Sequence, residues 1–407
     1  MNGPDAATAR VGTAGQRYAV VAGGGTAGHL QPALAIAEAL VARGHDRSTI
    51  EFLGSERGQD AATLSGRGFP VTLLPGRGIV RSLAPDDLVR NARSAWELVV
   101  AVVRGVGVVG RTRPRVVVAV GGYASLAGAM GALVHRVPLV LVNVDAVPGA
   151  ANRLFGRFAR ASAVGWEGNP LPRAVVTGTP VRPEIGAADR SPDGRAVARR
   201  ALGLPEDRAL VVVFGGSLGA RQINRAVDGA ARRWADRDDL AIYHIVGRRD
   251  WAGYGFDPDV ERVDGAGGPG APDSGEVGLD LVRVPYEQRM ATAYAAADVV
   301  VCRAGAMTVA ELAASGTPSV LVPLPGAPGD HQSANARVLE RAGAAVLLPD
   351  PDCTPVGLAG VVEALLADPD RLASMGAAAK AVGRPDAADA GAAVVEANAR
   401  PATGGAR

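Results

Sequence analysis

The segment Tyr18–Gly25 reads YAVVAGGG, and the segment Ala209–Gly216 reads ALVVVFGG. Each is a run of small and β-branched apolar residues that ends in glycines. Each is followed by a stretch in which apolar residues recur at helical spacing. A strand, a glycine turn and a helix open a doubly wound α/β domain. Because this unit occurs twice, the sequence predicts two such domains.

Other apolar runs fit buried strands separated by helical or loop segments. They are Ile50–Leu53, Val71–Leu74, Val116–Val120, Pro138–Val142 and Ser162–Val164 in the first half, and Ala241–Val246, Val282–Val284, Val299–Cys302, Ser319–Pro323 and Ala345–Leu347 in the second. Strands that alternate with helices predict parallel sheets covered on both faces, because each parallel connection needs a crossover. A cleft at the carboxyl ends of both sets of strands is the expected ligand site.

Glycine and proline cluster at Thr177–Pro183, which reads TGTPVRP, and this marks a domain boundary. The predicted units are residues 17–180, residues 181–375 and a helical segment at 376–399. The first sixteen residues lack the apolar stretch of a secretion signal and are interpreted as a disordered leader. Asp264–Asp280 is rich in glycine and proline, which predicts a surface insertion.

Composition narrows the class of protein. The 407 residues are 48% hydrophobic and 21% charged, as in ordinary globular proteins, and the net charge of +2 gives no argument for nucleic-acid binding. Cys302 and Cys353 are too few for a disulfide framework or a cysteine-built zinc site. The most apolar run, Leu98–Gly110, is shorter than the ~20 residues that span a bilayer and is interrupted by Arg104. No transmembrane helix is predicted.

The glycine loops admit more than one interpretation. Gly23–Gly28 matches the GxGxxG pattern of dinucleotide-binding folds. Such folds also place an acidic residue at the end of the second strand, but Glu51 stands at its start and Glu56 beyond it. The loop therefore favours a helix N-terminus that binds phosphate or another anion, with a merely tight turn as the alternative. Gly215–Gly219 has the same character.

Four motifs carry a family resemblance: Gly24–His29 (GGTAGH), Gly121–Tyr123 (GGY), Gly215–Ser217 (GGS) and Cys302–Glu311 (CRAGAMTVAE). In their order and spacing, residues 17–395 resemble the MurG family. The resemblance implies a GT-B fold: a second domain that binds UDP-N-acetylglucosamine (UDP-GlcNAc) faces a first domain that binds the acceptor, and segment 376–399 packs back on the first domain. It implies an inverting transfer of N-acetylglucosamine to lipid I, giving lipid II for peptidoglycan. It also implies a cytoplasmic enzyme that is peripheral on the inner face of the cell membrane.

The resemblance assigns one group of residues to the donor: Arg182, Ser217, Ala306, Met307, Thr308, Glu311, His331, Gln332 and Asn335. Thr308 and Glu311 also fall in the first turns of the helix after Val299–Cys302, where a hydroxyl and a carboxylate can face a nucleotide. A capping box formed by these two residues is the alternative. Arg182 has the alternative of a hinge ion pair, and the 330–335 stretch that of a solvated loop.

His29 is the candidate base, because an imidazole titrates near neutrality; its alternative role is to position the acceptor diphosphate. The residues assigned to the acceptor are Thr26, Ala27, Gly28, Tyr123, Ser125 and Asp145. Helix N-termini and polar side chains can stabilise charge on the leaving diphosphate, so we expect neither a metal nor another cofactor. Three Asp-Pro-Asp stretches, which begin at Asp257, Asp350 and Asp368, fit turns and helix starts better than metal sites.

One segment departs from the family pattern. Where the family has His-Glu-Gln-Asn, Val142–Asp145 reads VNVD. The family's carboxylate is thus missing at Asn143, and whether Asp145 replaces it is open. The identity of the acceptor is open as well. The alternatives are a UDP-sugar transferase with another acceptor, an isomerase like UDP-GlcNAc 2-epimerase, and a non-catalytic nucleotide-sugar-binding protein.

A membrane-facing surface is a further expectation. Cationic and apolar residues mix, as on a peripheral membrane surface, at Arg77, Ile79, Val80, Arg81, Leu83, Arg90, Arg93 and Trp96. A core helix with a solvated basic edge explains the same pattern. Protein partners are not predicted.

Overall fold

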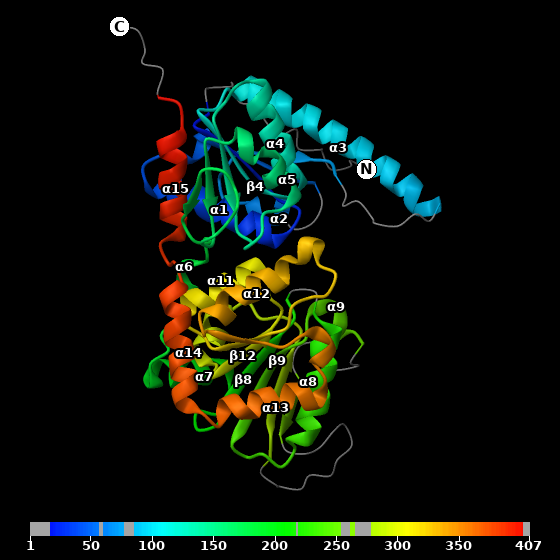
Figure 1. Cartoon of the computed structure of the whole chain (residues 1–407), viewed down its shortest axis with the longest axis vertical. Coiled ribbons are helices and arrows are strands. Elements are labelled where there is room, and N and C mark those ends of the chain that lie inside the picture. Colours follow the sequence, from blue (N-terminus) through cyan, green and yellow to red (C-terminus); the bar gives the residue numbers. More distant parts are fainter. Residues whose placement is uncertain are drawn as a thin grey trace, which may run out of the picture.

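Two α/β domains lie one above the other (Figure 1). The computed structural model describes residues 17–56, 60–76, 85–216, 219–253, 261–264 and 278–401. Within them, the strands form two seven-stranded sheets, in each of which the first strand of the domain is an interior strand.

The first sheet is parallel throughout. Its order is β3 (Val71–Leu74), β2 (Ile50–Ser55), β1 (Ala19–Gly23), β4 (Val116–Gly121), β5 (Leu139–Asn143), β6 (Ala161–Val164) and β7 (Ala174–Val176). The helices of this domain are α1 (Ala27–Ala42), α2 (Asp60–Leu64), α3 (Pro85–Thr112), α4 (Gly122–Val134) and α5 (Ala150–Phe155).

The second sheet has the order β10 (Glu261–Asp264), β11 (Asp280–Val284), β9 (Leu240–Ile245), β8 (Ala209–Phe214), β12 (Val299–Cys302), β13 (Ser319–Leu321) and β14 (Ala345–Leu347). Its helices are α6 (Pro183–Gly186), α7 (Pro192–Leu202), α8 (Arg221–Arg233), α9 (Arg248–Trp251), α10 (Met290–Ala296), α11 (Ala306–Ser315), α12 (His331–Arg341), α13 (Pro355–Leu366), α14 (Pro369–Val382) and α15 (Ala387–Asn398). β10 runs antiparallel to β11. Strands β7 and β10 have no counterpart among the predicted strands.

Both faces of each central strand are buried, which explains the continuous apolar runs. Along β1, Val21 packs with the α1 side of the sheet, whereas Val20 packs with the α4 side. Full burial of one such side chain contributes about 1.5–3 kcal/mol. Small residues bring α4 close to the sheet: a Cβ added at Gly128 would lie 2.5 Å from the Ala22 Cβ.

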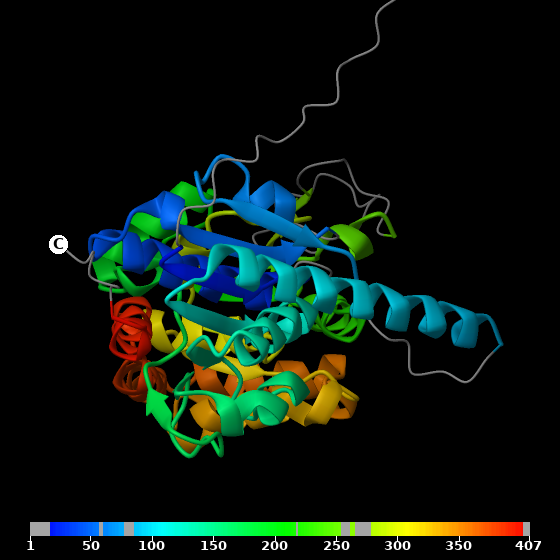
Figure 2. The ribbon, with the colours of Figure 1, turned by 90° about the horizontal axis from the view of Figure 1, so that it is seen from above.

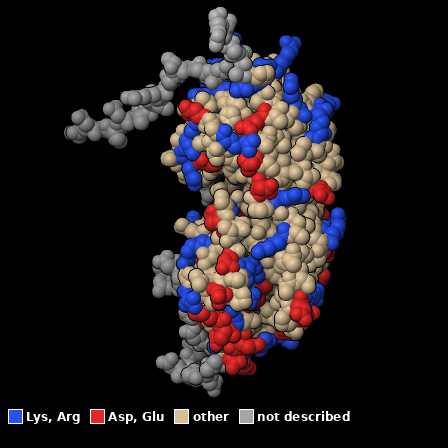
Figure 3. Space-filling model, turned by 90° about the vertical axis from the view of Figure 1, so that its left-hand side faces the viewer, with Lys and Arg blue, Asp and Glu red and all other residues tan. Residues whose placement is uncertain are grey.

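The chain returns from the second domain to the first at its C-terminal end. α15 packs against α1, where Ala392 and Val395 are buried in the core of the first domain. Arg43 pairs with Glu396 at 2.9 Å and with Asp389 at 2.8 Å. Cationic and acidic side chains are interspersed over this side of the molecule (Figure 3).

Helix α3 projects beyond the rest of the first domain (Figure 2). Trp96, Val99 and Val103 on it are 68%, 52% and 65% exposed. Within the described residues, every helix is too short or too polar to cross a bilayer.

Candidate active site

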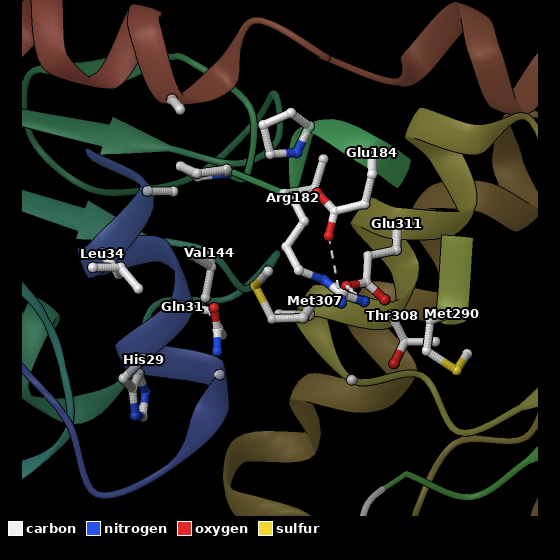
Figure 4. A pocket seen from close by; sticks show the side chains of 18 of the residues that line it. His29, Gln31, Leu34, Val144, Arg182, Glu184, Met290, Met307, Thr308 and Glu311 are labelled. Carbon is white, nitrogen blue, oxygen red and sulfur yellow. Dashed lines mark ion pairs between the residues drawn. The ribbon is translucent and has the colours of Figure 1, made fainter. Parts of the chain in front are cut away.

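A cavity of about 1000 Å³ lies between the two domains. The first domain contributes α1 and the loop after β5, and the second contributes the ends of β8 and β9 and the start of α11. Figure 4 shows side chains from both domains facing this space. Ten of the predicted site residues line it: Thr26, Gly28, His29, Asp145, Arg182, Ala306, Met307, Thr308, Glu311 and His331.

His29 stands in the first turn of α1, and its Nδ1 lies 3.0 Å from the Thr26 hydroxyl. Its ring packs on the glycines that open α4. A Cβ added at Gly121 would lie 2.4 Å from His29 Cδ2, and one at Gly122 would lie 2.5 Å from the Gly24 carbonyl oxygen. Both glycines have positive φ, 133° and 74°, which other residues rarely adopt. The two predicted loops therefore meet around His29.

Burial lowers the pKa of His29 below its ordinary value. The negative charges of Asp145 and Asp60 raise this pKa, and His331 lowers it, but the cost of desolvating the charged ring is the largest effect. Burial therefore favours the neutral imidazole, which is the form that can accept a proton.

Asp60, the first residue of α2, holds the first glycine loop in place and was missed by the sequence analysis. Its Oδ2 accepts hydrogen bonds from Gly25 N at 2.9 Å and Ser55 N at 2.7 Å, and the residue is 1% exposed. A Cβ at Gly24 would lie 2.0 Å from the same oxygen. This glycine therefore leaves room for a buried carboxylate as well as shaping the turn.

Two residues assigned to acceptor binding donate hydrogen bonds from their hydroxyls to backbone carbonyls of the first domain. Tyr123 donates to the Leu74 carbonyl at 2.8 Å, and the buried Ser125 donates to the Gly122 carbonyl at 2.8 Å. Ala27 begins α1. Roles for these residues in acceptor binding stay predictions.

A second cavity of about 280 Å³ adjoins the first, since His29, Val144 and Asp145 line both. The rest of its lining is Val120, Gly121, Gly122, Asn143, Gly149, Ala150, Ala151 and Asn152. Asn143 is buried; its amide donates to the Asp145 carbonyl at 2.6 Å, and its Oδ1 accepts from Asn152. α4 begins beside this cavity, and a helix N-terminus of this kind favours an anion.

On the donor side, α11 starts after Gly305, which has no side-chain cap. Glu311 lies more than one turn further and accepts a 2.9 Å hydrogen bond from the Tyr294 hydroxyl. Thr308 and Glu311 thus do not form the capping box considered from the sequence. Burial raises the pKa of Glu311, against the opposing effects of Tyr294 and Arg182.

Arg182 lies between two carboxylates at the junction of the domains (Figure 4). Its guanidinium is 3.6 Å from Glu184 Oε1 and 3.9 Å from Glu311 Oε1. The arginine therefore forms ion pairs and is also part of the cavity wall. Its side chain is 37% exposed, so it is accessible to an anionic ligand.

The three residues predicted to bind the sugar lie in three different environments. His331 lines the cavity, whereas Gln332 uses its Oε1 to accept from Leu324 N at 2.9 Å. Asn335 is fully buried, and its amide contacts residues of both domains. Ser217 lies outside the described residues.

An apolar wall of Phe214, Ile245 and Tyr286 completes the cavity and was not predicted. Phe214 and Ile245 are the last residues of β8 and β9. The rule that ligands bind at the carboxyl ends of parallel strands was the signal that could have identified them.

The acidic motifs have structural partners. Asp350 pairs with Arg303, and Asp368 caps α14 by accepting from Arg371 N at 2.9 Å. Asp257 lies outside the described residues. Among the residues that are described, no three His, Cys, Asp or Glu side chains come together as metal ligands would.

Comparison with known proteins gives consistent matches to one family. Residues 19–164 match the glycosyltransferase family 28 N-terminal domain, and residues 210–390 match its C-terminal domain. The UDP-N-acetylglucosamine–N-acetylmuramyl-(pentapeptide) pyrophosphoryl-undecaprenol N-acetylglucosamine transferase of Desulforudis audaxviator is 36% identical over 379 residues, which cover 91% of this chain and 95% of the relative. The protein of that name from Nocardioides sp. is 41% identical, with 89% and 93% covered.

Solved structures share the fold. MurG of Acinetobacter baumannii has a TM-score of 0.69 at 24% identity, covering 94% of this chain and all of that one. A UDP-N-acetylglucosamine 2-epimerase has a TM-score of 0.57 at 13% identity, with 92% and 94% covered. The predicted GT-B fold of two Rossmann-like domains is confirmed.

Proposed function

We propose, because the chain belongs to the MurG family of glycosyltransferases, that it transfers N-acetylglucosamine from UDP-GlcNAc to lipid I and so forms lipid II for peptidoglycan. The observation that carries this proposal is that one cavity holds His29 of the first domain and Glu311 of the second. A group able to accept a proton thus faces a nucleotide site across a single space.

The donor fits the second-domain side of the cavity. Phe214, Ile245 and Tyr286 offer an apolar wall for the flat uracil ring, and the Glu311 carboxylate can accept hydrogen bonds from the ribose hydroxyls. The diphosphate would lie at the start of α11, where backbone N–H groups point outward and the helix dipole favours negative charge.

The reaction is a displacement at the anomeric carbon. The hydroxyl of the acceptor sugar attacks C1 as the bond from C1 to the UDP oxygen breaks, and the anomeric configuration inverts. His29 takes the proton from the attacking hydroxyl. The electron pair of the broken bond leaves on UDP, whose charge the start of α11 and Arg182 stabilise. These groups suffice without a metal, so a chelator should leave turnover unchanged.

The acceptor is lipid-linked, and α3 offers a surface for the membrane. Trp96, Val99 and Val103 are three and four residues apart, so they lie on one side of this projecting helix. We propose that they contact the inner face of the cell membrane and that the protein is a cytoplasmic, peripheral enzyme. Residues 77–84, which carry part of the predicted membrane surface, lie outside the described residues.

The test is release of UDP from UDP-GlcNAc by the purified protein, with and without a short-chain lipid I analogue. We expect release to depend on the analogue and to accompany a disaccharide product detected by mass spectrometry. Release of a free epimerised sugar without any acceptor would instead support an isomerase, whose fold is the same. UDP binding without release would indicate another acceptor or a binding protein.

A further inference from the structure

Asn335 joins the two domains through a fully buried amide. Its Oδ1 accepts a 2.8 Å hydrogen bond from Ala146 N in the first domain. Its Nδ2 donates to Asp145 Oδ1 at 2.9 Å in the first domain and to the Ala304 carbonyl at 3.2 Å in the second. Both polar atoms of the side chain are therefore committed to protein partners.

Asp145 is held from two sides. Asn335 binds one of its carboxylate oxygens, and the Asn143 amide binds its main-chain carbonyl at 2.6 Å. Its other carboxylate oxygen has no hydrogen bond within the described part of the chain. Asp145 lines both cavities, as His29 does, so the two residues border the same space.

The charges that act on His29 come from three elements. Asp145 follows β5, Asp60 begins α2, and His331 begins α12. The Asp60 Oδ2 accepts from the amides of Gly25 and Ser55, while its Oδ1 is buried without a hydrogen bond among the described residues, and His331 opposes protonation of the ring. Asp145 has the larger effect of the two carboxylates on the His29 pKa and, unlike Asp60, lines both cavities.

We propose that Asp145 is the positioning carboxylate of the base His29, and that Asn335 holds it there from the donor-binding domain. Because Asn335 belongs to the second domain, the base is fully assembled only where the two domains touch. The carboxylate absent at Asn143 is thereby supplied two residues later in the same loop. This inference rests on the proposed transfer reaction.

In this role Asn335 acts through Asp145, whereas the role implied by the family resemblance is direct contact with the donor sugar. A residue that contacts the sugar sets the Michaelis constant for UDP-GlcNAc. A residue that acts through Asp145 instead sets the rate of proton acceptance and leaves donor binding unchanged. Steady-state kinetics therefore distinguish the two roles of Asn335.

Asp145→Asn is the first variant, because its oxygen can still accept from Asn335 while the negative charge is lost. We expect kcat/KM for the acceptor to fall about 100-fold, with unchanged UDP affinity. The Asp145 charge raises the pKa of His29, so its removal should move the acidic limb of the rate profile to lower pH. Asp386→Asn is the matched control: Asp386 lines the cavity but does not act on the His29 pKa, so the limb should stay in place.

Asn335→Asp tests the link between the domains, since it places a carboxylate oxygen against Asp145. We expect a lower kcat, an unchanged Michaelis constant for UDP-GlcNAc, and a double variant with Asp145→Asn that is no slower than the poorer single variant. A raised Michaelis constant with intact kcat would overturn the inference in favour of sugar binding.

Titration of the His29 ring by NMR provides a readout that does not need turnover, with the signal assigned by loss in His29→Gln. A lower His29 pKa in Asp145→Asn than in the wild-type protein is expected, and an unchanged value overturns the inference. Failure of the wild-type protein to transfer the sugar would refute the proposed function instead, while the NMR comparison would still test the effect of the Asp145 charge on His29.

Discussion

The Tyr294 hydroxyl donates a 2.9 Å hydrogen bond to Glu311 Oε2, so one oxygen of this carboxylate is fixed by the core of the second domain. The other lies 3.9 Å from the Arg182 guanidinium. Tyr294 is itself fully buried, which gives Glu311 a rigid support. A carboxylate fixed in this way can bind two neighbouring ribose hydroxyls without first being ordered.

Glu311→Gln should therefore weaken UDP binding at least about 10-fold, because hydrogen bonds to a charged group are worth about 1.5–3 kcal/mol each. Isothermal titration calorimetry with UDP measures this directly. Tyr294→Phe keeps the carboxylate but removes its support, and we expect a smaller loss. Unchanged affinity in Glu311→Gln would refute the ribose assignment.

His29→Gln should lower kcat by about 10²–10⁴-fold and leave the affinity for UDP unchanged, because the ring acts on the acceptor proton. Burial lowers the His29 pKa, so the wild-type rate should hold its plateau down to a pH below the ordinary histidine value of 6.5 and then fall. Steady-state rates from pH 5 to pH 8 test this. Equal losses in turnover and in UDP affinity would argue against a role as base.

Asp60→Ala should reduce both stability and acceptor binding. It removes the acceptor of Gly25 N, which is exposed, and of the buried Ser55 N, whose lost hydrogen bond costs about 1–3 kcal/mol. The first glycine loop would then lose its fixed shape next to His29. Urea unfolding gives the stability, and the Michaelis constant for the lipid I analogue reports the loop. A variant with lowered stability but an unchanged acceptor constant would show that the loop does not contact the acceptor.

The fold could be predicted because the sequence patterns that identify its strands are local. The runs that became β1 and β8 are buried on both faces, so they are continuously apolar and readable within a few residues. β7 is short and exposed along its length, and β10 lies at the edge of its sheet. Because such strands do not need a continuous apolar run, the sequence did not predict either of them.

The site was predictable only in part, because several of its contacts join distant segments. Asp60 lies 35 residues from Gly25, and no local pattern links the two. Asn335 is 190 residues from Asp145. The motif around Asn335 indicated a functional role for this residue. The packing of one domain on the other, however, decides which groups its amide contacts.

Replacement of two exposed apolar residues on α3 should weaken membrane binding. Trp96→Ser with Val103→Ser removes apolar area from the projecting helix and leaves its buried residues in place, so thermal unfolding should change little. Co-sedimentation with vesicles of mixed anionic and zwitterionic lipid measures the partition. Val356→Ser is the control, since Val356 is 69% exposed on α13 of the other domain. Equal binding by all three proteins would exclude α3 as the membrane surface.

His244 should make the protein sensitive to acid. It is fully buried in β9, where its Nε2 lies 3.0 Å from Asn224 Oδ1. The Asn224 amide donates to the Val246 carbonyl, so its Oδ1 is the acceptor and the His244 proton lies on Nε2. Burial, helped by the charge of Arg283, lowers the pKa of His244 to about 3.

The unfolded chain therefore takes up a proton below pH 6.5 that the folded protein does not. The stabilising contribution of neutral His244 is complete above pH 6.5 and is lost as the pH falls toward about 3. At pH 5 the loss from this residue is about 2 kcal/mol, from the 1.36 kcal/mol that corresponds to one pH unit. His244→Gln can retain the hydrogen bond to Asn224 without titrating, so urea unfolding at pH 7 and pH 5 should differ less in this variant than in the wild type. His135→Gln, at an exposed position, is the control; an unaltered pH dependence in His244→Gln would mean that other groups govern the acid sensitivity.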